Sequence, residues 1–415
     1  MIPVHAGVGK NTKNVVESNA MQIVIPGFFF MGLSGGIKKD GRKDMGLIYS
    51  EVPAVAAGVF TRNWVKAAPV ILTKKRLQKG YVQAILVNSG CANACTGERG
   101  MEDAKTLSEE AARILKISPD LIAVSSTGVI GEFLPVKKMS AQLPCLCKDL
   151  TDEKVEDFAQ AIITTDTVTK IAFRKKIIAG KKIIIGGVAK GAGMINPSLA
   201  TMLVFIVTNA AVLPRTLQSL LDEGVKGSLN RITIDGDTST NDTVLLLANG
   251  QAGNRSFSKK TADATGFKTM LFRVLEELAQ KIVQDGEGAT KIIEIRVQKA
   301  KSFEEAETIA RSIAHSPLVK TAFYGEEVNW GRIIAAAGKT IFPIAFEKVD
   351  LFVGKIPLVK KGVNVAPHNE KQAQAILTQR SVTVTLVLNQ GKREASILTT
   401  DLSPEYVTIN AGYKS

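Results

Sequence analysis

Hydrophobic and polar positions along this chain follow strand-like patterns in some segments and helix-like patterns in others. Residues 201–210 form an apolar, β-branched run without charge, which predicts a strand buried on both faces. The segment 190–200 before it is rich in Gly, Asn, Pro and Ser and predicts a loop. Residues 101–116 and 266–288 place apolar side chains at helical spacing and predict amphipathic helices.

The remaining patterns predict strands and helices spread over the whole chain. Strands are expected in MQIVIPG, MGLIYS, AAGVFT and AILVNSG between residues 21 and 90, and at 121–131, 181–190, 243–250 and 291–297. Helices are expected at 135–163 (two, with a loop at 149–153), 213–229 and 304–316. From about residue 340 most segments are of strand type, including EYVTINA at 405–411. Helices and strands interspersed without regular alternation favour an α+β fold with helices flanking two sheets.

Composition narrows the class of protein. The 415 residues are enough for two or three domain-sized units, and 45% hydrophobic with 22% charged residues is ordinary for a globular chain. The net charge of +14 suits nucleic acid, an anionic surface or an enzyme that handles carboxylates. Because the lysines are dispersed and only 6% of residues are aromatic, no stacking surface is evident and we expect no nucleic-acid partner.

Two further features of the sequence indicate where the protein is found in the cell and whether it binds a metal. No secretory signal is evident, and the apolar segment 21–33 is short and broken by Pro26 and Gly27, so we expect a cytoplasmic protein without a membrane span. No histidine is near the cysteines in sequence, so we expect buried free thiols and no metal; the cysteines are Cys91, Cys95, Cys145 and Cys147.

Thr201 stands where the Gly-rich loop meets the buried strand. A threonine there, preceded by the small Ala200, can attack its own upstream carbonyl, and an N-to-O acyl shift followed by hydrolysis would make it a new N-terminus. Its α-amine, with a pKa of about 7.7–8.0, would then serve as base for its own hydroxyl. Taken by itself, such a stretch is more often an ordinary turn before a core strand.

Other motifs offer polar groups for a site, each with an ordinary alternative. The STG turn at 126–128 can supply backbone N–H groups and the Thr127 hydroxyl to an oxyanion, or simply end a strand. TTDT at 164–167 ends a predicted helix, where capping is the ordinary role. Lys190 could bind a carboxylate or be an exposed loop lysine. Glu287, between glycines, could bind a ligand amine or be solvated.

Several familiar site patterns do not fit. TIDGDTSTND at 233–242 is rich in Asp and Thr but lacks the spacing of a calcium loop, so its indication of a cation site is weak. Neither G-x-x-x-x-G-K-[ST] nor a G-x-G-x-x-G after a strand occurs, so we expect no nucleotide. No G-x-S-x-G serine accompanies His5, His315 or His368, which we interpret as structural.

The motifs taken together are far more specific than any one of them, and the chain resembles the ornithine acetyltransferase (glutamate N-acetyltransferase) family. They run in order from about residue 20 to the end: GIKKDGRKDMGLI, AAGVFTRNWVKAAPV, NSGCANACTG, SSTGVIG, AIITTDT, KGAGMINPSLATML, IDGDTSTNDT, DGEGATK, NWGRIIAAAGK and DLSPEYVTINAGYKS. This joint pattern outweighs the ordinary interpretation of each motif.

The resemblance implies a fold similar to N-terminal-nucleophile hydrolases, with the family's own topology. It also implies a precursor that cleaves itself between Ala200 and Thr201 into an α chain, 1–200, and a β chain, 201–415. The two chains are expected to stay intertwined, in an α2β2 heterotetramer.

Residue roles follow from the same resemblance. Thr201 is the implied nucleophile, and Thr127 and Gly128 are the implied oxyanion hole. The implied substrate-binding residues are Thr164, Lys190, Thr201, Glu287, Asn410 and Ser415. The implied reaction moves the acetyl group of N-acetylornithine to glutamate through an acetyl-threonine, in arginine biosynthesis, without a cofactor or metal. The sequence leaves open whether acetyl-CoA is also a donor.

Two rival functions remain at this stage. An N-terminal-nucleophile amidohydrolase or aminopeptidase would share the cleavage but pass the acyl group to water. A basic nucleic-acid-binding protein would show steeply salt-dependent retention on DNA and no self-cleavage.

Overall fold

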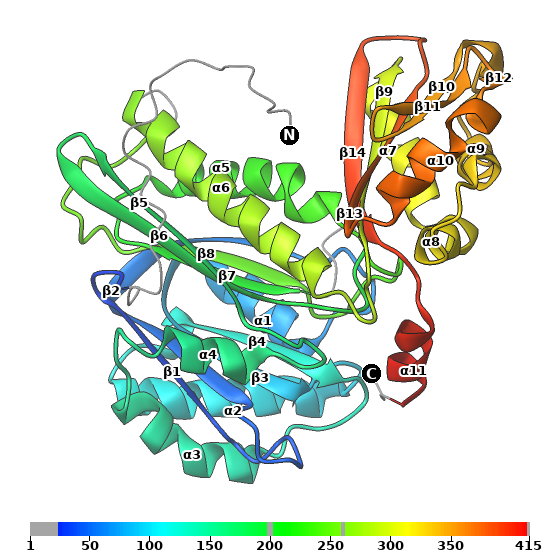
Figure 1. Cartoon of the computed structure of the whole chain (residues 1–415). Coiled ribbons are helices and arrows are strands. Elements are labelled where there is room, and N and C mark those ends of the chain that lie inside the picture. Colours follow the sequence, from blue (N-terminus) through cyan, green and yellow to red (C-terminus); the bar gives the residue numbers. More distant parts are fainter. Residues whose placement is uncertain (1–23, 197–201, 259–261, 413–415) are drawn as a thin grey trace, which may run out of the picture.

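The computed structural model describes residues 24–196, 202–258 and 262–412 (Figure 1). Ala200 and Thr201, the proposed cleavage junction, lie outside the described residues, as does Ser415.

The larger sheet interleaves strands from both sides of residue 200. Its order is β4(Ile122–Val129), β3(Tyr81–Cys91), β2(Met45–Phe60), β8(Thr243–Ala248), β7(Leu203–Thr208), β6(Lys181–Lys190) and β5(Lys170–Ile178), and β1(Phe28–Leu33) also pairs with β2. The β3–β4 and β7–β8 pairs are parallel and the others are antiparallel, so the sheet is mixed. β7 and β8 therefore lie between strands that precede residue 200.

Helices cover this sheet in layers. The helices concerned are α1(Ala68–Leu77), α2(Gly97–Leu115), α3(Val136–Lys148), α4(Val155–Ile162), α5(Pro214–Gly227) and α6(Ala262–Gln284). In Figure 1, α5 and α6 lie over β5 to β8, and α2 and α3 lie beyond β1 to β4 on the opposite side. α4 packs against β1 and β2 in between. This is the layered α+β arrangement that the sequence predicts.

β7 shows why the predicted buried strand forms. All its residues are buried, and alternate side chains enter different cores. Val204 and Ile206 share a cluster with α6, whereas Phe205 packs on the other face, with its ring centroid 5.7 Å from that of Phe158 in an edge-to-face contact. Fully burying a side chain of this size stabilises the fold by about 1.5–3 kcal/mol.

A second sheet, built from strands between residues 292 and 400, stands to one side of the first and has its own hydrophobic cluster (Figure 1). Its order is β12(Val363–Asn364), β11(Ile356–Lys360), β10(Asp350–Val353), β13(Ser381–Val387), β9(Ile292–Ala300) and β14(Arg393–Thr400). Its helices are α7(Phe303–Ala314), α8(Pro317–Tyr324), α9(Trp330–Gly338) and α10(Ala366–Leu377).

The sequence prediction for EYVTINA is wrong. These residues belong to a helix, α11(Pro404–Gly412), rather than a strand. No residue of α11 is buried, so the apolar alternation does not mark a sheet face. The helix starts where Ser403 Oγ accepts the Tyr406 N–H at 3.3 Å and Pro404 fixes the first turn.

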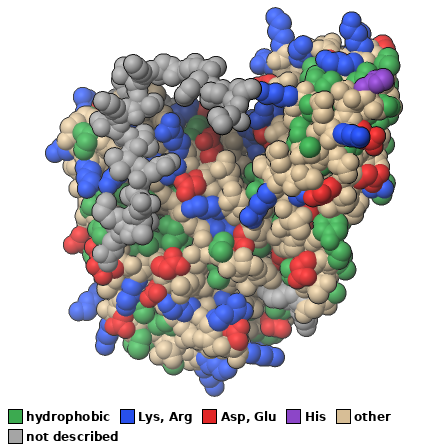
Figure 2. All heavy atoms as spheres, viewed as in Figure 1, with side chains coloured by type: hydrophobic (Ala, Val, Ile, Leu, Met, Phe, Trp, Pro, Cys, Tyr) green, Lys and Arg blue, Asp and Glu red, His purple; other side chains and the backbone are tan. Residues whose placement is uncertain are grey.

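None of the helices in the described part of the chain combines the length and apolar character of a membrane span. Acidic and basic side chains are interspersed over the face drawn in Figure 2.

Candidate active site

One pocket brings together the sequence-predicted site residues that lie within the described ranges. It is lined by Ala92, Thr127, Gly128, Ile130, Thr164, Thr165, Lys190, Gly193, Met194, Ser239, Thr240, Asn241, Glu287 and Asn410. These include six predicted residues from five different places in the sequence, which the fold makes neighbours: Thr127 with Gly128, Thr164, Lys190, Glu287 and Asn410.

The STG motif closes one side of this pocket at the end of β4. Gly128 has φ +131°, a left-handed conformation that favours glycine, and a Cβ there would be 2.3 Å from the carbonyl carbon of Gly90. Asn241 fixes the strand end by donating Nδ2–H to the carbonyl of Ser126 at 2.8 Å. The Thr127 side chain is consequently held at the pocket wall.

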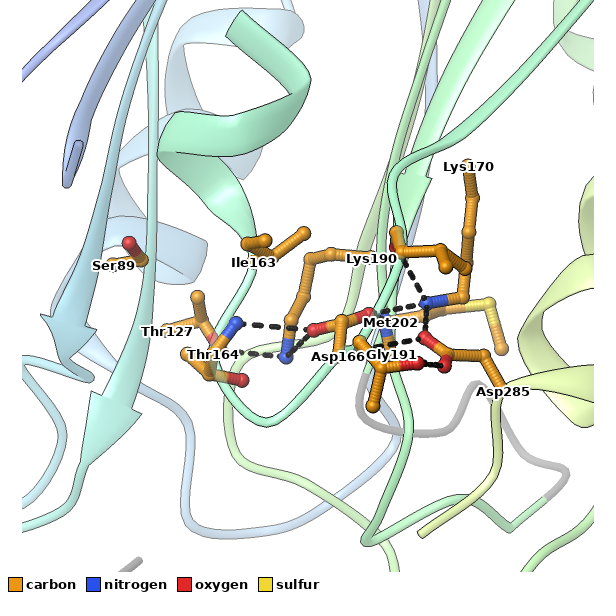
Figure 3. Close-up of polar contacts among 12 residues, drawn as sticks. Ser89, Thr127, Ile163, Thr164, Asp166, Lys170, Lys190, Gly191, Met202 and Asp285 are labelled. Carbon is orange, nitrogen blue, oxygen red and sulfur yellow. Dashed lines mark hydrogen bonds and ion pairs between the residues drawn. The ribbon is translucent and has the colours of Figure 1, made fainter. Parts of the chain in front are cut away.

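Lys190 lies at the end of β6 and is 3% exposed, which excludes the alternative of an exposed loop lysine. Its ammonium donates to Thr127 Oγ1 at 3.4 Å and lies 4.0 Å from Asp166 Oδ2 (Figure 3). Burial lowers the pKa of Lys190, and the charge of Asp166 opposes that shift. A buried cation thus faces the proposed oxyanion hole.

Asp166 anchors this cation from the TTDT loop after α4. Its carboxylate accepts the Gly191 N–H at 2.6 Å, the Thr164 N–H at 3.0 Å and the Lys170 ammonium at 2.6 Å (Figure 3). Burial by itself would raise the pKa of Asp166, but the charges of Lys190 and Lys170, with these hydrogen bonds, lower it to about 2.

The ion network continues to residues that sequence reasoning missed. Lys170 is fully buried and also donates to Asp285 Oδ2 at 2.5 Å, and Asp285 accepts the Thr167 N–H at 3.1 Å. Asp285 stands two residues before Glu287 in the motif DGEG, so its position beside a candidate was the available signal.

Glu287 and Asn410 close the opposite side of the pocket. Asn410 Nδ2 on α11 donates to Glu287 Oε2 at 2.8 Å, and the Glu287 N–H donates to the Ala192 carbonyl at 2.9 Å. A Cβ on Gly193 would lie 2.3 Å from Glu287 Oε2, so any larger residue at position 193 would displace this carboxylate from its present place.

Asp235 lies in the Asp-rich motif 233–242 and binds the loop that contains Gly193. It accepts the N–H groups of Met194 at 2.5 Å and Ile195 at 2.8 Å, and the Tyr406 hydroxyl at 3.3 Å. Burial raises the pKa of Asp235 to about 6, against the effect of its backbone hydrogen bonds. One carboxyl therefore connects the loop that leads to residue 200 with α11.

The cysteine prediction is correct for one member of each pair. Cys91 and Cys147 are buried, but Cys95 and Cys145 are exposed, and all are free thiols. Cys95 lies in a continuous run of small residues, which does not distinguish a buried from an exposed side chain. No group of three or more His, Cys, Asp or Glu residues within the described ranges is arranged to hold a metal ion.

The layered α+β fold and this partly buried pocket of hydroxyl, amide, ammonium and carboxylate groups suit an enzyme that handles a small charged molecule. The ArgJ family model matches residues 30–415, and the chain belongs to the ArgJ family. The resemblance identified from the sequence is confirmed.

Relatives with the same family name are similar over nearly their whole length. The arginine biosynthesis bifunctional protein ArgJ of Desulfotalea psychrophila is 49% identical over 94% of this chain and 100% of its own. The proteins of the same name from Syntrophotalea carbinolica and Thermotoga neapolitana are 46% and 47% identical, over 95% and 94% of this chain and 100% and 99% of their own.

Two solved structures are also similar. The crystal structure of arginine biosynthesis bifunctional protein ArgJ from Bacillus halodurans is 42% identical, with a TM-score of 0.43, over 46% of this chain and 100% of that chain. Ornithine acetyltransferase of Mycobacterium tuberculosis, in complex with ornithine, is 37% identical, with a TM-score of 0.38, over 42% of this chain and 94% of that chain.

Proposed function

We propose that this chain transfers the acetyl group of N-acetylornithine to glutamate in arginine biosynthesis, in the cytoplasm. The observation that carries the proposal is the convergence of Thr127, Gly128, Lys190 and Glu287 on one pocket in a member of the ArgJ family. The Thr127 hydroxyl and the Gly128 N–H can meet a developing oxyanion, and the Lys190 ammonium and Glu287 carboxylate can meet both charges of an amino acid.

Before it can transfer acetyl groups, the chain cleaves itself once, between Ala200 and Thr201. The strand order supports an arrangement in which both products stay together, because β7 and β8 of the 201–415 chain lie between β2 and β6 of the 1–200 chain. Separating the chains would expose the central strands of a sheet, which is very costly. An α2β2 assembly of these chains is the proposed oligomer, and its molar mass in solution tests it.

Acetyl transfer then proceeds in two balanced steps. The Thr201 hydroxyl attacks the acetyl carbonyl, its proton passes through the α-amine to the leaving nitrogen, and ornithine departs. Glutamate reverses these events and takes the acetyl group from Thr201. Thr127 and Gly128 stabilise the oxyanion in both steps, and the Lys190 ammonium, 3.4 Å from Thr127 Oγ1, adds positive charge beside them.

The two ends of the amino acid need charged partners in this partly buried pocket, since a charge that loses water without gaining a partner is costly. Lys190 is the proposed partner of the α-carboxylate and Glu287 that of the ornithine side-chain amine. Thr164, Asn410 and Ser415 are proposed to complete substrate binding with hydroxyl, amide and terminal carboxylate groups.

Ornithine release from N-acetylornithine, measured with and without glutamate, tests this function. We expect sustained release only with glutamate present, and equal release into water would instead indicate the amidohydrolase alternative. The similar ArgJ proteins are named bifunctional, which favours a second activity. Acetyl-CoA is the proposed second donor, and glutamate-dependent release of free CoA is the readout.

A further inference from the structure

The side chain of Asp242 is a buried carboxyl to which the steps above give no role. It is 1% exposed, and Oδ1 accepts the Met202 N–H at 3.0 Å. Oδ2 has no hydrogen-bond partner among the described residues. The neighbouring Thr61 hydroxyl donates instead to the Ser239 carbonyl at 2.7 Å. A buried carboxyl oxygen without a hydrogen-bond partner lowers the stability of the fold. We therefore infer that Oδ2 has a role in the chemistry of a neighbouring group.

The sheet register places Asp242 at the junction. β7 and β8 are parallel, with Leu203 opposite Thr243, and the Thr243 N–H donates to the Met202 carbonyl at 3.2 Å. Asp242 is therefore opposite Met202, where both strands begin. Met202 is bonded to Thr201, so the carboxyl is hydrogen-bonded to the peptide unit that joins Thr201 to the strand.

The surroundings of Asp242 favour a carboxyl that keeps its proton. Burial raises its pKa well above the ordinary value, against the opposing effects of the Met202 N–H and the Lys190 charge. Lys190 is the charged group that faces Asp242 from β6, and Asp166 partly compensates its charge.

We propose that Asp242 is the acid–base residue of self-cleavage, which exchanges protons with the amide nitrogen and the hydroxyl of Thr201. The inference rests on the proposed cleavage before Thr201. In the first step the Thr201 Oγ–C bond to the Ala200 carbonyl carbon forms and the C–N bond breaks. Asp242 protonates the departing nitrogen and recovers the proton of the attacking hydroxyl. Water then hydrolyses the ester, which releases the Ala200 carboxylate and restores the hydroxyl.

The test follows newly synthesised full-length chain in a cell-free system, by denaturing gel, at pH values on both sides of neutrality. Asp242→Asn keeps an acceptor for the Met202 N–H but cannot exchange the proton. We expect it to cleave roughly a hundredfold more slowly or worse, the scale of acid–base catalysis. Asp237→Asn, an exposed change in the same loop, is the matched control and should cleave at the wild-type rate.

The pH dependence separates a chemical role from a structural one. Wild-type cleavage should slow as pH rises through the raised pKa of Asp242, because the protonated acid is the active form. Asp242→Glu should retain this dependence at a reduced rate, and Asp242→Asn should lack it.

Asp242→Asn that cleaves at the wild-type rate, or more slowly with the wild-type pH dependence, would overturn the assignment. A wild-type cleavage rate that rises continuously with pH would also overturn the assignment. This measurement does not depend on whether the variants fold. Wild-type protein that stays a single chain contradicts the proposed function itself, so the two failures are distinguishable.

Discussion

The Lys190 ammonium on β6 donates a hydrogen bond to Thr127 Oγ1 on β4 at 3.4 Å. In the sheet order β3, β2, β8 and β7 separate these two strands, so the contact requires the sheet to fold over itself. A shared cluster that includes Ile85 of β3 and Val188 of β6 fills the space between the two parts. Packing of the core is therefore what brings the cation to the proposed oxyanion hole.

Replacing this cation should weaken acetyl transfer. Lys190→Met removes a charge-assisted interaction of about 1.5–3 kcal/mol, so kcat/KM for N-acetylornithine should fall roughly ten- to a hundredfold. Lys182→Met, an exposed change on the same strand, is the control. Steady-state kinetics on both proteins check this, and full activity of Lys190→Met would remove Lys190 from the site.

Asp166 should make the fold sensitive to acid. Because the pKa of Asp166 is lowered to about 2, its ionised form stabilises the folded state above the unfolded-state pKa of about 3.9, and this stabilisation is lost as pH falls through that window. Asp166→Asn leaves Lys170 and Lys190 undercompensated and should cost about 3–5 kcal/mol near neutral pH.

Urea unfolding at a series of pH values measures both effects of Asp166. The variant should be less stable near neutral pH and show a flatter decline in acid than the wild type. Asp149→Asn, on an exposed side chain, is the control. Identical acid profiles of Asp166→Asn and wild type would show that the Asp166 ion pairs contribute no net stability.

Replacing Gly193 should weaken substrate binding, because a side chain there would displace the Glu287 carboxylate. In Gly193→Ala the new Cβ would collide with the carboxylate, which must move away from its hydrogen bond with Asn410. We expect a raised KM for N-acetylornithine at nearly unchanged thermal stability. Gly227→Ala, where a Cβ meets no atom within 4 Å, is the matched control. Unchanged KM in Gly193→Ala would mean that Glu287 does not bind substrate.

The C-terminal helix should serve substrate binding more than folding. No residue of α11 is buried, so deleting residues 410–415 should leave folding and self-cleavage largely intact. The deletion removes the Asn410–Glu287 hydrogen bond, and kcat/KM should drop roughly ten- to a hundredfold. Thr408→Ala, on the same helix, is the control. A truncated protein with the full transfer rate would place the C-terminus outside the site.

Sequence patterns predicted the elements whose burial is local and regular. The apolar run after Thr201 is β7, and the periodic segment 266–288 overlaps α6(Ala262–Gln284). The nature of α11 was missed because its apolar residues are not buried, although Ser403 and Pro404 carried a helix-start signal.

The candidate site residues were predicted from motif resemblance and not from periodicity or spacing. Motif resemblance supplied Thr127, Lys190 and Glu287, but not the residues that support them. Lys170 and Asp285 are 115 residues apart in the chain, and no periodicity encodes such a pairing. Asp242 was visible only as part of an Asp-rich motif, since its burial depends on the β7–β8 register.

The mass of the denatured protein, before and after exposure to N-acetylornithine without glutamate, tests self-cleavage and acetyl transfer together. We expect two chains, residues 1–200 and 201–415, with one acetyl group added to the second chain and removed again by glutamate. Thr201→Ala should remain a single unacetylated chain. Active wild-type protein that remains a single 415-residue chain, or that is cleaved but never acetylated, would rule out Thr201 as the acetyl-accepting nucleophile.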